Sequence, residues 1–94
     1  MRNRTRSGAR QSGSASVLAD LAPGQRATVV GMAPGAEPAV AQRLVLLGFR
    51  PAARVDAIRR APLGDPTIYR VQDTELCLRS REARLIEVVP EAAR

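Results

Sequence analysis

The chain has 94 residues, which is enough for one small domain but too few for a deep active-site cleft. Hydrophobic residues make up 45% of the chain and aromatic residues only 2%, so the core must be built from Val, Leu, Ile and Ala. The formal net charge is +6, but four of the 15 Arg lie within residues 1–16 and the rest of the chain is nearly balanced, so the charge alone is weak support for nucleic-acid binding.

The chain divides into a domain and two tails. Residues 1–16 are rich in Arg, Ser and Gly and are expected to be a disordered tail, because they carry too little apolar surface to fold. The domain is expected over residues 17–90, and residues 91–94 form a short C-terminal tail. Within the domain, Ala22-Pro23-Gly24-Gln25 has Pro and Gly placed as in a type II turn, and residues 26–32 are predicted to form the first strand.

One helix is predicted over residues 37–47. Pro38 suits its first turn, and the spacing of Val40, Leu44 and Leu47 places these three side chains on one face, which we expect to be the core face. Gly48 is expected to end the helix in a left-handed conformation.

After the helix the apolar pattern changes to a period of two, which predicts short strands around residues 55–60, 68–71, 76–78 and 85–89. Residues 72–75 are short enough for a hairpin, and residues 79–83 are expected to form one helical turn capped by Ser80. The predicted fold class is all-β: a small SH3-like barrel of about five strands, with one inserted α-helix and a single helical turn before the last strand.

Four blocks of the chain resemble the FeoA family (ferrous iron transport protein A). They are LADLAPG at 18–24, RLVLLGFRP at 43–51, RRAPLGDP at 59–66 and LCLRSREA at 76–83. The resemblance covers nearly all of residues 17–89. One departure is Ala52, where the family usually has Gly, and a turn that demands a positive φ there would be strained by Ala.

The resemblance implies a cytosolic SH3-like barrel that works with FeoB, a membrane ferrous iron transporter with a cytosolic G domain. The same fold occurs as a C-terminal module of iron-dependent repressors of the diphtheria toxin repressor type, but those proteins need a helix-turn-helix and a metal site for which 94 residues have no room. The single cysteine, Cys77, and the lack of an apolar run of about 20 residues agree with a cytoplasmic protein without a membrane span. Binding to FeoB would place it at the periphery of the inner membrane, and contact of the Arg-rich tail with anionic lipid is left open.

The residue types argue against catalysis, metal binding and a cofactor. The chain has no His, so the usual general base and the commonest partner of carboxylates in ferrous iron sites are both missing. Cys77 lies between Leu76 and Leu78 in a predicted strand, where we interpret it as an ordinary thiol. We therefore predict no catalytic, cofactor-binding or metal-ligating residues.

Nucleic-acid binding is the alternative function. SH3-like barrels can bind RNA, and the Arg of the tail would add affinity for a polyanion. Binders of single strands stack bases on aromatic side chains, however, and Tyr69 is the only aromatic residue on a predicted strand.

Binding of a protein partner is the predicted function. Val45 and Leu46 point away from the expected core face of the helix, either to meet a partner or to be covered by the loop around Leu63 or the segment around Leu18. The loop formed by Pro62, Leu63, Gly64, Asp65 and Pro66 either meets the same partner or only reverses the chain. The hypothesis is that helix and loop together dock on the cytosolic part of FeoB; self-association through the same patch is the alternative.

Overall fold

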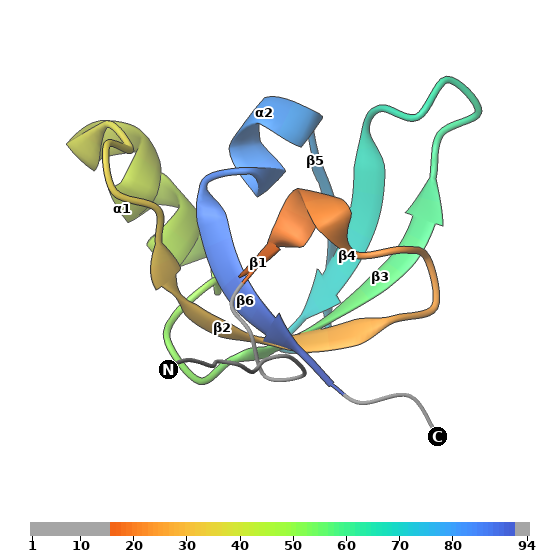
Figure 1. Cartoon of the computed structure of the whole chain (residues 1–94), viewed down its shortest axis with the longest axis horizontal. Helices are drawn as coiled ribbons and strands as arrows, with labels where there is room; N and C mark the ends of the chain where they lie inside the picture. The colour runs from red at the N-terminus through yellow and green to blue at the C-terminus, as the bar shows by residue number, and fades with distance from the viewer. Residues whose placement is uncertain (1–15, 92–94) are drawn as a thin grey trace, which may run out of the picture.

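The structure, a computed structural model, describes residues 16–91 (Figure 1). In chain order the elements are β1 (Ser16–Val17), the 3-10 turn η2 (Leu18–Asp20), β2 (Arg26–Met32), α1 (Pro38–Leu47), β3 (Arg54–Arg60), β4 (Thr67–Val71), β5 (Thr74–Leu78), α2 (Ser80–Ala83) and β6 (Ile86–Pro90). The predicted tails lie outside the described residues except for Ser16, which pairs with Val88 in the sheet, and Glu91.

All six strands belong to one antiparallel sheet with the order β1-β6-β2-β3-β4-β5. The register shifts between Val29 and Gly31 in β2 and between Ala57 and Arg59 in β3, and such irregularities increase the local twist and bend of a strand. Figure 1 shows the resulting strongly bent sheet, with η2 packed against α2 over its open side. The predicted fold class is confirmed; the sixth strand is the two-residue β1, too short to leave an alternating pattern.

The turns follow the local sequence closely. Gly24 has φ +93° and the Gln25 N–H donates to the Ala22 carbonyl at 2.9 Å, which confirms the type II turn. Gln72 and Asp73 both have positive φ, as a two-residue type I′ hairpin between β4 and β5 requires.

The core lies between the inner face of the sheet and the segments that cover it. Its buried hydrophobic residues come from nearly every element: Leu18, Leu21, Ala27, Val29, Leu44, Phe49, Val55, Ala57, Tyr69, Val71, Leu78, Ala83, Ile86 and Val88. Helix α1 contributes only Leu44 fully, with Val40 packed at the edge of the core. The prediction that Leu47 faces the core is wrong, because Leu47 is 39% exposed.

The start of α2 also differs from the prediction. Ser80 is the first helical residue and not the cap; Arg79 precedes the helix, and the Glu82 carboxylate accepts a hydrogen bond of 3.1 Å from the Arg79 N–H. The Ser80 N–H is bonded instead by Asp65, at 2.9 Å. A residue 15 positions away in the sequence thus satisfies a donor at the start of α2, which local sequence patterns cannot show.

Candidate interaction surfaces

The loop between β3 and β4 presents an exposed apolar side chain on a well-braced backbone. Leu63, at its tip, is 96% exposed. Within the loop, the Gly64 N–H donates to the Ala61 carbonyl at 2.7 Å, and the Ala61 N–H donates to the Pro66 carbonyl at 2.9 Å. The Asp65–Pro66 peptide bond is cis, and the Asp65 side chain is occupied by its bond to the Ser80 N–H. Asp65, predicted as a partner contact, therefore serves first to fix the loop.

A shallow hollow of about 290 Å³ lies at the base of this loop. Its lining includes Pro62, Pro66, Ile68 and the exposed Cys77. The hollow extends the apolar surface around Leu63 onto the outer face of β4 and β5, so that a partner side chain could pack beside the loop.

The outer side of α1 forms a second exposed apolar surface. Leu46 is 78% exposed, whereas Val45 is half-buried. Leu18 is fully buried in the core and Leu63 is itself exposed, so neither of the segments that could have covered Leu46 does so. A leucine with so much exposed surface on a short helix needs an explanation other than core packing.

These two surfaces are not parts of one patch. Figure 1 shows α1 at the left edge of the molecule and the loop between β3 and β4 projecting at the upper right. The expectation that helix and loop meet one partner surface together is therefore replaced by two separate candidate surfaces, the loop surface around Leu63 and the helix surface around Leu46.

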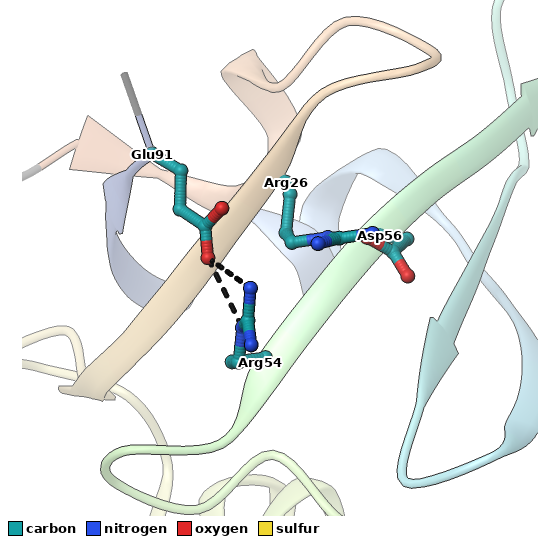
Figure 2. Close-up of polar contacts among 4 residues, drawn as sticks. All are labelled: Arg26, Arg54, Asp56 and Glu91. Carbon is teal, nitrogen blue, oxygen red and sulfur yellow. Dashed lines mark hydrogen bonds and ion pairs between the residues drawn. The ribbon is translucent and has the colours of Figure 1, made fainter. Parts of the chain in front are cut away.

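The outer face of the sheet is polar around Arg26 and Arg70, and the charges there are arranged in matched pairs. Figure 2 shows Arg26 beside Asp56, with 2.5 Å between Nε and Oδ1, and Arg54 with Glu91, with 2.8 Å between Nη2 and Oε2. One register row continues this alternation across four strands in the order Arg26, Asp56, Arg70, Glu75.

A hollow of about 310 Å³ opens on this polar face, lined by three Arg together with Asp56, Gln72 and Asp73. Each of the three Arg already faces a carboxylate, and the side chains are roughly half exposed. Exposed pairs of this kind contribute about 0–1 kcal/mol each. Because its positive charge is locally neutralised, the hollow is a poor site for an anion.

The described residues hold little that could perform chemistry. Residues 16–91 contain no group of three or more His, Cys, Asp or Glu side chains placed to hold a metal ion. The two aromatic residues of the chain, Phe49 and Tyr69, are both buried, so the described surface offers no aromatic platform for base stacking. None of the helices in this part of the chain has the length and apolar character that crossing a bilayer requires.

Comparison with known proteins assigns the chain to a class and then to a family. The class is the small SH3-like barrel, because the chain forms one bent antiparallel sheet of six strands and a solved structure of the same fold is described as an SH3 domain protein. A family model described as "FeoA domain" matches residues 17–90. The chain belongs to the FeoA family.

Two solved FeoA proteins support this assignment. The chain is 41% identical to FeoA from Chlorobium tepidum, with a TM-score of 0.73 over 81% of this chain and 70% of that one. It is 30% identical to FeoA from Stenotrophomonas maltophilia, with a TM-score of 0.70 over 80% of this chain and 94% of that one. The latter protein was solved with zinc and is described as a prokaryotic SH3 domain protein and a candidate activating factor for bacterial ferrous iron transport.

A manganese-dependent transcriptional repressor shares the fold at 20% identity and a TM-score of 0.72, over 84% of this chain and 43% of that one. At this identity the likeness shows the fold alone. The barrel is thus found in FeoA proteins and within a larger regulator.

Proposed function

We propose that this protein is an accessory factor of ferrous iron uptake that acts by binding the cytosolic part of the FeoB transporter, with Leu63 as the principal contact, and not by catalysis. Membership of the FeoA family supports the role in ferrous iron transport. The observation that carries the proposal is the combination of a fully exposed leucine with a braced loop backbone.

This arrangement lowers the cost of binding, because the backbone of the loop is already ordered before a partner is bound. Burying one leucine side chain contributes about 1.5–3 kcal/mol. Because the Leu63 loop is already held by two internal hydrogen bonds and by Asp65, little of that free energy is lost in fixing the backbone on binding.

An accessory protein changes the activity of a transporter only if it binds two of the transporter's states with different affinities. The nucleotide state of the FeoB G domain is the natural variable. Binding to FeoB would then place this protein at the cytoplasmic side of the membrane.

The test is a titration of the full chain against detergent-solubilised FeoB of the same organism, with GDP and with a non-hydrolysable GTP analogue. We expect saturable binding that Leu63→Glu weakens at least about tenfold, the equivalent of about 1.4 kcal/mol. The matched control is Leu46→Glu, the same change on the opposite side of the molecule. Unchanged binding of Leu63→Glu would contradict the proposal, and a loss confined to Leu46→Glu would move the contact to α1.

Self-association through either leucine is a competing use of these surfaces. It predicts a mass that rises with protein concentration in sedimentation velocity and falls to that of the monomer in Leu46→Glu or Leu63→Glu. A monomeric profile of the wild type at all concentrations removes it.

A further inference from the structure

A third surface, independent of Leu63, lies between the two helices. A hollow of about 380 Å³ is lined by Val40 and Arg43 of α1, by Arg81 and Glu82 of α2, and by Leu85 just after α2. Val40 and Leu85 pack against the core from outside and form an apolar floor. The hollow is at the lower end of the roughly 300–1,000 Å³ that protein binding pockets occupy, and its size suits one or two aliphatic side chains.

The rim of this hollow is positively charged. Its single acid, Glu82, is already occupied, because it accepts hydrogen bonds from the Arg79 N–H and from the Arg43 guanidinium. Arg81 is exposed and forms no ion pair with any of residues 16–91. Arg79 and Arg84, which flank α2, are exposed and likewise lack an ion pair in this part of the chain.

The hollow between the helices differs from the hollow on the sheet face in how its Arg are paired. There each Arg lining the hollow faces a carboxylate, whereas here Arg43 is paired with Glu82 but the second lining Arg, Arg81, has no ion pair with any of residues 16–91. Charge complementarity therefore selects a negatively charged occupant for the rim, and the floor selects an apolar group.

The helix surface around Leu46 continues the hollow along α1. Arg43, Leu46 and Leu47 lie three and four residues apart, which places them on neighbouring positions of one helix side. A bound segment could thus follow α1 from the hollow towards the exposed Leu46.

We infer that the hollow between α1 and α2 binds an acidic protein segment that inserts an aliphatic side chain between Val40 and Leu85 and places its carboxylates against Arg81 and the neighbouring Arg. The segment belongs to another protein, because the Arg-rich sequence of residues 1–16 has the wrong charge to occupy the rim. Single-stranded nucleic acid is the less suitable polyanion, since both aromatic residues of the chain are buried.

The test uses the full chain and a fluorescein-labelled synthetic peptide in which two leucines are embedded among glutamates. Fluorescence anisotropy should show saturable binding that Arg81→Glu weakens at least about tenfold. This substitution should leave the fold intact, because Arg81 is exposed and forms no ion pair with any of residues 16–91. The matched control is Arg59→Glu, the same charge change at an exposed position on β3, with an expected change of less than about twofold for so remote a site.

The peptide itself provides the second comparison. Replacing its leucines by serines keeps the charge and should weaken binding about tenfold, which separates insertion into the floor from simple ionic attraction. The inference would be overturned if Arg81→Glu and Arg59→Glu weakened peptide binding equally, or if the serine peptide bound as tightly as the leucine peptide. Tighter binding of oligo(dT) or of phosphatidylglycerol vesicles, with the same dependence on Arg81, would also overturn it in favour of another polyanion. None of these measurements involves FeoB, so their failure is distinct from failure of docking through Leu63.

Discussion

The Asp65 carboxylate accepts a hydrogen bond of 2.9 Å from the backbone N–H of Ser80, the first residue of α2. The first N–H groups of a helix have no partner within the helix, so Asp65 takes the part of a cap from a distant loop. The same bond holds the loop that carries Leu63, and it therefore links the loop surface to the helix that lines the hollow.

Removing this bond should destabilise the protein. Asp65→Ala is expected to lower the free energy of unfolding by about 1 kcal/mol, the typical value of a helix cap, as measured by urea denaturation. Asp65→Asn keeps an acceptor oxygen and should retain most of the stability. Equal losses in the two variants would show that the hydrogen bond to Ser80 is not the cause.

Ala52 occupies a position that favours glycine. In the turn from Arg50 to Ala53, the Ala53 N–H donates to the Arg50 carbonyl at 2.9 Å, Pro51 is second and Ala52 third, with φ +76°. Ala52→Gly should relieve about 1–2 kcal/mol of strain in the folded state. The greater conformational entropy of glycine in the unfolded chain offsets part of this gain, so we expect the free energy of unfolding to rise by about 0.5–1 kcal/mol. Ala41→Gly, inside α1, should lower it by about 1 kcal/mol in the same urea experiment.

Glu82 should make stability sensitive to acid. The hydrogen bond from the Arg79 N–H is the main cause that lowers the pKa of Glu82; burial opposes it, and the Arg43 side chain and the charge of Arg81 lower the pKa further. A lowered pKa in the folded state means that the stabilisation is present above the ordinary pKa of glutamate, about 4.3, and is lost as the pH falls through the lower folded value.

Denaturation curves between pH 6 and pH 2.5 test this expectation about glutamate ionisation. Glu82→Gln should lose less stability across the acid range than the wild type does. Arg43→Gln leaves the larger cause, the Arg79 N–H, in place and should keep most of the acid-sensitive part. Superimposable pH profiles of wild type and Glu82→Gln would contradict the assignment.

Tyr69 should resist ionisation while the protein is folded. Burial is the main cause that raises the pKa of Tyr69, whereas its hydrogen bond with Thr67 and the charge of Arg60 act in the opposite direction. Because the folded pKa exceeds the unfolded one, this contribution to stability is complete below about pH 10 and is lost as the pH rises towards the folded value.

The chain contains one tyrosine and no tryptophan, so absorbance at 295 nm follows this single phenol. We expect its alkaline transition to coincide with unfolding measured by circular dichroism in the far ultraviolet. A reversible titration near pH 10 in the still-folded protein would contradict the burial of the hydroxyl group.

Features set by local backbone chemistry could be predicted from the sequence. Gly24, Gly48 and the Gln72–Asp73 hairpin require particular φ values, and the pattern around them revealed the turns, the helix end and most strands. The positive φ of Ala52 fits the expectation drawn from the resemblance, in which the family usually has Gly at this position.

Features set by the tertiary structure could not be predicted. Helix periodicity placed Leu47 on the core face, but only Leu44 of α1 is fully buried and Leu47 is 39% exposed. The bond between Asp65 and Ser80, the separation of the Leu63 loop from α1, and the hollow between the helices all depend on how distant segments pack. No local signal in the sequence reports these distances.

The row of alternating charges on the outer face of the sheet has a consequence for how the strands find one another. Arg26, Asp56, Arg70 and Glu75 are aligned on β2, β3, β4 and β5. A slip of one residue would turn a strand's core side chains outward, and a slip of two towards the start of β3 would set Arg26 or Arg70 opposite Arg54, where like charges repel. The pairs that add little to the stability of the finished fold thus disfavour its misaligned competitors.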